Sequence, residues 1–358
     1  MLEIFGAKKP LHALGVDIGQ STIKVVQLRL EKEKVFLETY GEIALGPYSG
    51  FEPGQAVALG DEKILQALED LFKASKITTR NGVFSIESSS AFISMIEIPN
   101  VGDADLKTII PLEARKYLPI PVSEVQLDFW RLPSGGVEDT EAKKRTQVVL
   151  AAVKNTTLEK YQRYAVKLGL ENPMFEIEGF SFMRSSLRGD QTIQLFLDIG
   201  SQYTTVLLIQ AGIILDLHVV SHGSQNSTIQ IARALALPVG TAEETKRKFG
   251  YLGDVSNPFL QEVMQLSSYP LFGEVARLLL TYERKYNQVV EGIVIGGGGA
   301  RTPGIVEAIK ETIHTPVRIA TPFDQIEVPA FLKDMITTIG PSYMVAVGLA
   351  LKKLKQTN

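Results

Sequence analysis

Apolar residues along the chain follow two periodicities, and the same succession of elements is predicted twice. In the first half, apolar runs predict strands at 11–16, 23–30 and 35–45. An amphipathic helix follows, because its apolar residues keep a helical spacing: Ile64, Leu65, Leu68, Leu71 and Phe72. The second half repeats the order with strands at 195–197, 206–209 and 213–220 and a helix at 224–235. This repetition predicts a duplicated α/β domain whose two lobes contain mixed sheets and face one cleft.

Residues 83–149 interrupt the first copy and are predicted to form an inserted α+β subdomain. The insert has its own strands, at 83–86, 92–98 and 125–132, and its own helix after Gly102. Pro111 falls inside that helix, where we expect it to kink or interrupt the helix. The predicted divisions are the first lobe (10–82 and 150–192), the insert (83–149), the second-lobe core (193–236 and 293–340), a helical subdomain (237–292) and a C-terminal helix returning to the first lobe (341–358).

A membrane is considered for two apolar segments, 206–220 and 343–355, whereas a third, 271–286, predicts a core helix. Residues 271–286 place their apolar side chains on one stripe, which is typical of a helix packed on a core. Residues 206–220 contain polar residues and fall short of a span of ~20 residues, so they predict a hairpin. Residues 343–355 end with lysines and carry no terminal aromatic anchor. We therefore expect no direct insertion into a membrane.

A short motif is the clearest sign of chemistry in the two halves. Residues 17–24 (Asp-Ile-Gly-Gln-Ser-Thr-Ile-Lys) have a near copy at 198–205, and an apolar run leads into each. Glycine allows a tight turn after the aspartate, and the hydroxylic residues lie where turn amides hydrogen-bond phosphate oxygens. Asp17 and Asp198 are suited to holding the waters of a Mg²⁺ ion that bridges phosphates. Either copy alone is more typical of an ordinary hairpin turn, but two copies favour a phosphate site.

Two further segments add to this interpretation. An apolar strand at 293–295 leads into four glycines, Gly296 to Gly299, and then into an amphipathic stretch after Pro303. Consecutive glycines leave room for a flat ring against the backbone, and a following helix start favours a nearby anion. Residues 241–250 predict a short helix in which Glu243 and Lys246 share a face. In isolation, that pair is equally typical of a solvated surface helix.

Composition is that of an ordinary globular chain. The 358 residues include no cysteine, which excludes disulfides and thiolate-bound metals and is compatible with a reducing compartment. The net charge of −3 gives no electrostatic argument for binding nucleic acid. Residues 1–10 lack the long apolar stretch of a signal peptide. We therefore expect a cytoplasmic protein.

The order of these motifs resembles that of the actin, heat-shock-protein-70 and sugar-kinase superfamily. It comprises two Asp-x-Gly turns, then an Ala-Glu-x-x-Lys helix, then a Gly-Gly-Gly motif. The chain is most similar to the PilM and FtsA group of bacterial actin-like proteins, and within it to the PilM family of type IV pilus assembly. The insert lies where that group carries its extra subdomain. Other matching segments span most of the chain: Ile98-Pro99, Leu106, 113–119, 147–153 and 346–350.

The resemblance implies an actin-like (ribonuclease H-like) fold that binds ATP and Mg²⁺ in its cleft, with Mg²⁺ held through water by Asp17 and Asp198. It implies the first phosphate loop at Asp17, Gly19, Gln20, Ser21, Thr22 and Lys24. It implies the second at Asp198, Gly200, Ser201 and Thr204. Glu243 and Lys246 would reach the ribose and base, and the adenosine would lie against Gly297, Gly298, Gly299 and Arg301.

The resemblance also implies a partner. PilM relatives take up the cytoplasmic N-terminal peptide of the membrane protein PilN between the first lobe and the insert. The expected function is thus a nucleotide-dependent scaffold in the cytoplasm, peripheral to the inner membrane through its partner, and a homo-oligomer is compatible with it. Candidate groove residues are Phe84, Ile86, Phe92, Arg115 and Tyr117. Apolar members of this set fit the insert's own core equally well.

Two other functions remain open. A small-molecule kinase needs a general base beside the acceptor hydroxyl, and no acidic residue has a sequence setting that demands this role. An FtsA-like division filament would need a membrane-binding tail or longitudinal contacts. Two roles fit Glu178: a water-orienting acid for ATP hydrolysis, or a surface carboxylate between the lobes.

Other features carry less weight. Trp130 is expected in the core, and residues 133–145 are expected to form a mobile polar hairpin tip rather than a docking patch. His218 and His222 have the spacing of a helical metal pair, but they are predicted to lie at a strand end and a turn, so we do not expect a metal there.

Overall fold

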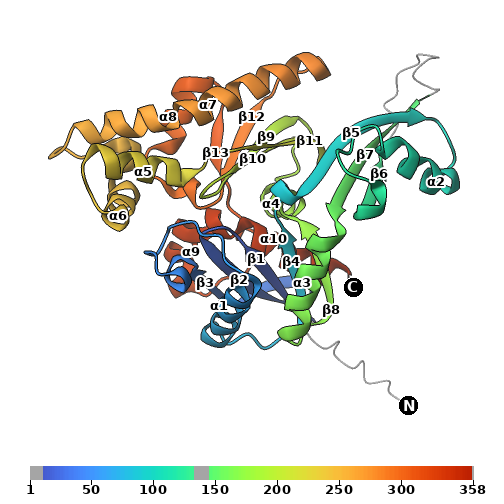
Figure 1. Ribbon diagram of the computed structural model, residues 1–358, viewed down its shortest axis with the longest axis horizontal. Coiled ribbons are helices and arrows are strands. Elements are labelled where there is room, and N and C mark those ends of the chain that lie inside the picture. The colour runs from blue at the N-terminus through green and yellow to red at the C-terminus, as the bar shows by residue number, and fades with distance from the viewer. Residues whose placement is uncertain (1–10, 133–144, 357–358) are drawn as a thin grey trace.

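The computed structural model describes residues 11–132 and 145–356, which form two lobes and a projecting insert (Figure 1). Two segments discussed above lie outside these residues: 1–10, which we expect to lack a signal peptide, and 133–144 of the expected polar hairpin tip. The first sheet has the strand order β3-β2-β1-β4-β8. Its strands are β1 (Leu11–Ile18), β2 (Thr22–Glu31), β3 (Lys34–Ala44), β4 (Asn81–Ile86) and β8 (Glu171–Ile177). β1, β2 and β3 are antiparallel, whereas β4 and β8 run parallel to β1, so the sheet is mixed, as predicted.

Helices cover both faces of the first sheet. Strand alternation sends Leu14 and Val16 to one face, where α1 (Asp61–Ala74) and α3 (Asn155–Lys167) bury their apolar stripes. Ala13, on the other face, packs against α10 (Met344–Gln356). The last helix of the chain therefore returns to the first lobe.

The second sheet joins the second lobe to the insert. Its order is β13-β12-β9-β10-β11-β5-β7-β6. The second-lobe strands are β9 (Ile193–Ile199), β10 (Thr204–Gln210), β11 (Ile213–Val220), β12 (Gly292–Gly296) and β13 (Val317–Ile319). The insert contributes β5 (Ala91–Pro99), β6 (Val125–Arg131) and β7 (Arg145–Lys154). A single residue pair, Asp216 with Ser94, connects the two parts through β11 and β5.

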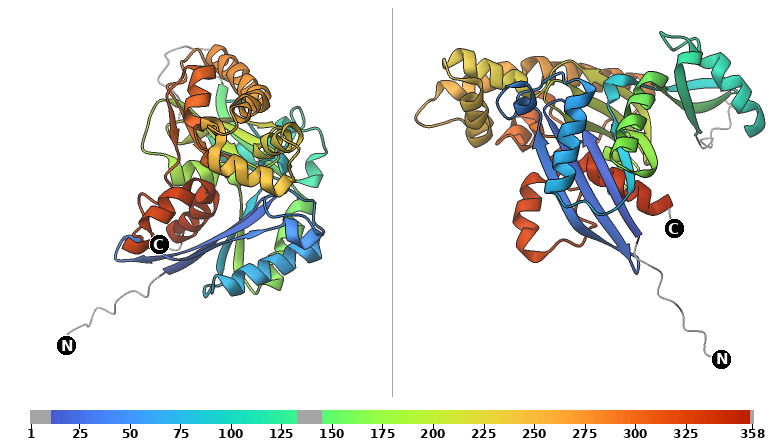
Figure 2. Two further views of the ribbon diagram at one scale, coloured as in Figure 1. Left: turned by 90° about the vertical axis from the view of Figure 1, so that its left-hand side faces the viewer. Right: turned by 60° about the horizontal axis from the view of Figure 1, so that its bottom comes forward.

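The remaining helices pack around this sheet. In the insert, α2 (Asp103–Ala114) covers β5 and β7. The first lobe ends with α4 (Glu178–Ser186). The second lobe adds α5 (Ser224–Ala234), α6 (Val239–Phe249), α7 (Phe259–Tyr286), α8 (Ile305–Ile313) and α9 (Lys333–Ile339). The insert and α6 lie at opposite ends of the molecule (Figures 1 and 2).

One local prediction is wrong, and one of the two outcomes expected of Pro111 does not occur. Residues 83–86 do not belong to the insert, because β4 lies inside the first sheet between β1 and β8. A strand buried on both faces is a continuous apolar run, which does not reveal the sheet it joins. Pro111 does not interrupt α2, which continues through Ala114. The segment that leaves the first lobe therefore begins after Ile86.

The described stretch Ala330–Gln356 is long and apolar enough to cross a membrane by length and composition. However, 67% of its most apolar window is buried inside the protein, and the core helix of a soluble protein passes the same test. Here α10 packs tightly on β1 and α4. An added Cβ at Gly15 would overlap the carbonyl oxygen of Ala346, and one at Gly348 would overlap that of Ser181. Two glycines thus allow α10 to approach two neighbouring backbones closely.

Replacing Gly15 by Ala should lower the free energy of unfolding by about 2 kcal/mol, because the new methyl group forces β1 and α10 apart. Urea unfolding followed by circular dichroism measures this change. Gly292 is a strand glycine, and an added Cβ there would lie 3.8 Å from the carbonyl oxygen of Pro316, so Gly292→Ala is the matched control. Equal stability of the two variants would contradict the tight contact.

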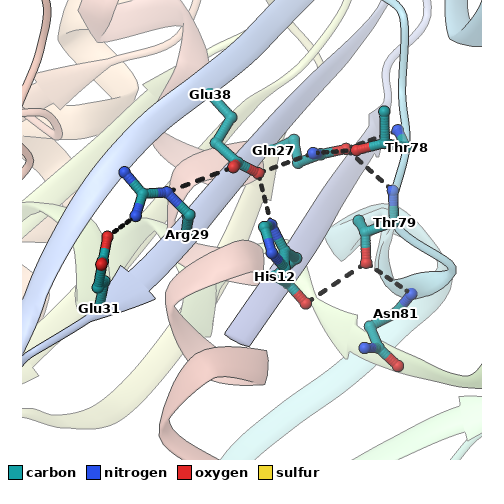
Figure 3. Close-up of polar contacts among 8 residues, drawn as sticks. All are labelled: His12, Gln27, Arg29, Glu31, Glu38, Thr78, Thr79 and Asn81. Carbon is teal, nitrogen blue, oxygen red and sulfur yellow. Dashed lines mark hydrogen bonds and ion pairs between the residues drawn. The ribbon is translucent and has the colours of Figure 1, made fainter. Parts of the chain in front are cut away.

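A buried glutamine joins the first sheet to the connection that precedes β4 (Figure 3). Gln27 is 2% exposed, and its amide oxygen accepts hydrogen bonds from the backbone N–H groups of Thr78 and Thr79. Its amide nitrogen donates to Glu38, which also contacts His12 and Arg29. Because these polar groups satisfy one another, the network orders the entry to β4 and hence the end of that strand at the cleft.

Candidate functional site

The two copies of the Asp-Ile-Gly motif form the same hairpin. The N–H of Gly19 donates to the Thr22 carbonyl oxygen at 3.0 Å, and that of Gly200 donates to the Tyr203 carbonyl oxygen at 3.0 Å. In the strand register, Asp17 lies opposite Lys24 and Asp198 lies opposite Thr205. The duplication inferred from the sequence is therefore also present in backbone hydrogen bonding and register.

Both hairpins open into one cleft of about 790 Å³ between the lobes. This volume is within the range of small-molecule sites. The cleft is lined by most of the residues expected to bind nucleotide: Asp17, Gly19, Gln20, Ser21, Thr22, Lys24, Asp198, Gly200, Ser201, Glu243, Lys246, Gly297, Gly298 and Arg301. Glu178 also lines it, so its carboxylate faces the cleft rather than the outer surface.

Two of the expected residues do not line the cleft. Thr204 is fully buried, and its hydroxyl donates to the His222 carbonyl oxygen at 2.8 Å. Gly299 is also buried, where an added Cβ would collide with Ile199. Thr205 takes the place predicted for Thr204, because neighbouring strand residues point to opposite faces. The sequence spacing indicates Thr205 rather than Thr204 as the cleft residue, since Thr205 follows Asp198 by the same seven residues that separate Lys24 from Asp17.

Carboxylates gather at the bottom of the cleft, and their environment disfavours the charged forms. Burial, followed by repulsion from Asp198, raises the pKa of Glu178 to about 8. Burial, followed by repulsion from Asp17, raises the pKa of Asp198 to about 7, although Lys24 opposes this shift. Burial also raises the pKa of Asp17. A site that holds several carboxylates with raised pKa values favours a cation.

Specific hydrogen bonds orient these side chains. Glu178 Oε1 accepts from the backbone N–H of Ser88 at 2.9 Å and from the Thr205 hydroxyl at 3.3 Å. Asp17 Oδ1 accepts from the Ser85 hydroxyl at 3.0 Å. Within residues 11–132 and 145–356, no three acidic or histidine side chains converge closely enough to hold a metal directly. The donor set instead fits a hydrated Mg²⁺ ion, which keeps several of its waters.

A buried ion pair lies on the α6 side of the cleft. Lys246 Nζ is 2.6 Å from Glu243 Oε2 and donates to the Thr228 hydroxyl at 2.8 Å. Burial lowers the pKa of Lys246 and is partly offset by Glu243. Burial alone would raise the pKa of Glu243, but Lys246, Thr228 and Arg247 together lower it. These contacts fix both side chains at the cleft wall.

The glycine run also lines the cleft. Gly297 has φ +82°, and an added Cβ there would collide with Asp198 Oδ1. An added Cβ at Gly298 would meet no atom within 4 Å. Glycine is thus needed at position 297, because the backbone there has a positive φ and a side chain would collide with Asp198. At position 298, the absence of a side chain leaves open space in the cleft.

The loop before α1 spans the two lobes at one side of the cleft. The backbone N–H of Ala56 donates to Gln225 Oε1 at 3.2 Å, and the Glu52 carboxylate accepts from the backbone N–H of Gly240. Because Gln225 and Gly240 lie on α5 and α6, this loop connects the first lobe to the helices beside the cleft.

Several residues that line the cleft were missed from the sequence, among them Glu42, Glu87 and Thr205. Glu87 follows β4 directly, and burial raises its pKa. Assigning β4 to the first sheet would have placed Glu87 at a strand end beside Asp17, which is where α/β proteins hold ligands. Glu42 lies opposite Lys24 in the register of β2 and β3.

A second hollow, of about 740 Å³, lies between the insert and the first lobe, and we call it the insert groove. Its apolar lining comes from both parts, with Ile213 and Ile214 of β11 added from the second lobe: Ile86, Trp130, Leu132, Val149, Ala151, Val153, Leu158, Phe175, Ile177, Phe180, Met183, Ile213 and Ile214. Charged residues also line it: Asp128, Arg131, Glu176, Arg184, Lys352 and Lys355. The groove is therefore an apolar trough with a charged rim.

Trp130 is a wall of this groove and not a core residue, so that prediction is wrong. The side chain is 42% exposed, and its ring lies 5.0 Å from that of Phe180 on α4. β6 is the edge strand of the second sheet, so a side chain there is covered only where another element reaches it. Trp130 thus links the insert to the first lobe.

Of the five residues predicted for the groove, only Ile86 lines it. Phe84 is fully buried in the first-lobe core, because β4 is an interior strand. Phe92 packs against the insert's own core. Arg115 and Tyr117 are exposed after α2 and do not reach the groove.

The groove and the cleft meet at three consecutive residues. Glu176 lines the groove, where Arg184 binds it through two hydrogen bonds of 2.6 and 2.8 Å and Lys352 lies at 2.9 Å. Glu178 lines the cleft, and Ile177 between them is buried. The junction of β8 and α4 thus presents one carboxylate to each hollow.

The histidine pair is occupied by other contacts. His222 Nε2 lies 2.9 Å from the Ser267 carbonyl oxygen, and His218 Nε2 lies 3.7 Å from Glu274. The two rings therefore contact different parts of α7.

A family model described as type IV pilus assembly protein PilM matches residues 15–354. The chain belongs to the PilM family. This confirms the family inferred from the motifs. Among curated relatives, cell division protein FtsA of Pseudomonas aeruginosa is 26% identical, covering 96% of this chain and 89% of its own. FtsA of Bacillus subtilis is 22% identical, covering 94% of this chain and 82% of its own.

Solved structures show the same fold. The PilM-PilN type IV pilus biogenesis complex matches with a TM-score of 0.80 at 22% identity, covering 96% of this chain and 98% of that chain. MreB 5 of Spiroplasma citri bound to AMPPNP matches with a TM-score of 0.56 at 13% identity, covering 98% of each. The fold of this PilM family member is therefore actin-like, as predicted.

Proposed function

We propose that this PilM family protein is an ATP-binding scaffold of type IV pilus assembly that binds the cytoplasmic N-terminal peptide of a PilN-like membrane protein. One observation carries the nucleotide part: two Asp-Gly hairpins with identical turn hydrogen bonds face one cleft with the glycine run. The similar MreB 5 structure contains AMPPNP, which supports a nucleotide in the same cleft.

In this proposal, Asp17 and Asp198 hold the waters of Mg²⁺, and the turn amides with Ser21, Thr22 and Ser201 bind phosphate oxygens. Mg²⁺ supplies charge neutralisation between the phosphates. Lys24 adds a positive charge beside Asp17. Glu243 and Lys246 bind the ribose and base, which lie against Gly297 and Gly298.

Glu178 is placed to act on a water molecule. Ser88 and Thr205 hold the same oxygen, Oε1, and leave the other oxygen for the cleft. With Mg²⁺ bound, the ionised form of this buried carboxyl would be favoured, and it would then orient the water and accept its proton, as in a weak ATPase. The kinase alternative needs a second substrate, so phosphate release from ATP without an acceptor distinguishes the two.

The insert groove is the proposed PilN site. The similar PilM structure was solved as a PilM-PilN complex, which supports a partner of this kind. The apolar trough suits apolar peptide side chains, and Trp130 offers a large exposed ring at its wall. A membrane-bound partner would place this protein at the cytoplasmic face of the inner membrane.

The sheet topology supplies a way for nucleotide to act on the groove. The insert continues the second-lobe sheet, whereas β8 and α4 on the other groove wall belong to the first lobe. A nucleotide that changes the angle between the lobes would therefore change the width of the groove. A differential affinity of a few kcal/mol shifts such an equilibrium.

Replacing Trp130 by Ala should weaken peptide binding by about 2 kcal/mol, or roughly 30-fold, because aromatic groove anchors dominate interface energies. Fluorescence anisotropy with the labelled N-terminal peptide of the PilN homologue from the same genome, with Mg-ATP present, measures this loss.

Phe331 is the matched control, since it is an exposed aromatic residue that does not line the insert groove. Phe331→Ala should bind as tightly as wild type. If Trp130→Ala does so too, the peptide does not occupy the insert groove.

A further inference from the structure

The outer face of α7 is exposed along most of its length and carries large apolar side chains between charged ones. Its inner face packs Val263, Leu271 and Val275 into the second-lobe core. On the outer face, Leu266 is 59% exposed, Tyr269 64% and Leu280 52%. α7 runs along the outer margin of the second lobe (Figure 1). Exposed apolar residues that share one face mark contact surfaces.

The residues on this face are arranged symmetrically about Gly273. Leu266 and Leu280 stand seven residues from it on either side, and Tyr269 and Arg277 stand four residues from it. At eleven residues, Glu262 precedes it and Arg284 follows it. Under an antiparallel two-fold pairing, each residue meets its counterpart on the other side. Leucine then meets leucine, the tyrosine ring meets a guanidinium, and an acid meets a base.

Gly273 itself has no role in packing within one chain. An added Cβ would meet no atom within 4 Å. A glycine inside a helix is about 1 kcal/mol less favourable than alanine, so Gly273 destabilises α7. No close contact within the monomer compensates for this cost. At the crossing point of two helices, glycine lets the backbones approach closely, which gives the residue a role.

We propose that two copies of this protein pair through α7, antiparallel and about a two-fold axis that passes beside Gly273. We assign a second copy of the chain to this face because, in the antiparallel pairing, Glu262 of each copy lies opposite Arg284 of the other. Arg277 is held by Glu274 through bonds of 2.8 Å or less, which fixes its guanidinium on the outer face.

This pairing leaves the proposed ligand sites free. The face consists of α7 residues that line neither the nucleotide cleft nor the insert groove. A helix pair buries less than a standard interface of about 1,600 Å², so we expect a dissociation constant on the order of 10 µM. A dimer would present two peptide-binding grooves from one assembly.

Sedimentation velocity of the full chain between about 1 and 100 µM measures the association. Wild type should shift from monomer to dimer and stop there, because a two-fold contact closes. Gly273→Leu should raise the dissociation constant at least tenfold without lowering the thermal midpoint, since the added side chain points into open space. Phe331→Ser, on the exposed surface of another element, should leave the association unchanged.

A charge exchange tests the antiparallel register directly. Glu262→Arg and Arg284→Glu should each weaken the dimer, because each places like charges opposite one another, and the double variant should restore it. The chain contains no cysteine, so Gly273→Cys introduces a single thiol. With diamide as oxidant it should form a disulfide-linked dimer, whereas Phe331→Cys should not.

The proposal is overturned if wild type stays monomeric at 100 µM, or if Gly273→Leu associates as tightly as wild type. Species that grow beyond a dimer with concentration would also overturn it, because they indicate a head-to-tail filament. Failure of the double charge exchange to restore association would exclude the antiparallel register.

Discussion

Replacing Asp198 by Asn should abolish the stabilisation that we expect from Mg-ATP. At ATP concentrations ~100 times the dissociation constant, wild type should gain about 2.7 kcal/mol in free energy of unfolding. Asn keeps the shape of the side chain but lacks the charge that attracts hydrated Mg²⁺. Thermal unfolding with Mg-ATP, with Mg-ADP and without nucleotide measures the difference.

Without nucleotide, the same variant should be about 1 kcal/mol more stable than wild type. Burial and the neighbouring Asp17 raise the pKa of Asp198, so its charge is a cost to the empty fold. Asp254→Asn is the control, since that exposed carboxylate does not line the cleft. A variant that retains the full wild-type shift with Mg-ATP would remove Asp198 from the metal site.

Raising the pH from about 5 to 8 should lower the stability of the nucleotide-free protein by about 3 kcal/mol through Glu178. The folded pKa of about 8 exceeds the unfolded value of 4.5. Between these values the folded protein retains a proton that the unfolded chain has released, so stability falls as pH rises. Each unit of pKa difference corresponds to about 1.4 kcal/mol, and access to water in the cleft reduces the total.

Glu178→Gln should reduce this dependence, because the amide does not titrate, whereas Asp198, whose pKa is also raised, still contributes to it. Urea unfolding at several pH values, without nucleotide or Mg²⁺, measures the slope for each variant. Glu311→Gln, on the exposed face of α8, should retain the wild-type slope. If Glu178→Gln also retains it, the carboxyl of Glu178 is not the group that carries the pH dependence.

The sequence predicted the cleft well because its residues belong to local motifs. A strand, an aspartate and a glycine turn define each hairpin within a few neighbouring residues, and their repetition indicated that the two face each other. Thr205 was missed because choosing it over Thr204 requires the phase of strand alternation after the turn. Gly299 was included because a run of glycines does not reveal which of them touches Ile199.

Errors in tertiary placement have a different origin. The exposure of Trp130 depends on β6 being an edge strand, and this follows from pairing between distant segments. The burial of Phe84 depends on β4 joining the first sheet rather than the insert. α7 begins at Phe259, twelve residues before the predicted start, and Pro270 lies inside the helix.

The junction at Glu176, Ile177 and Glu178 has a consequence for how this family can diverge. Within this run of three residues, Glu176 supplies a carboxylate to the insert groove and Glu178 supplies one to the cleft. The buried Ile177 between them fixes their spacing. A substitution favoured by a new groove ligand therefore also disturbs the cleft. We expect family members that have changed partners to carry compensating replacements around the cleft, so that the two surfaces evolve as one unit.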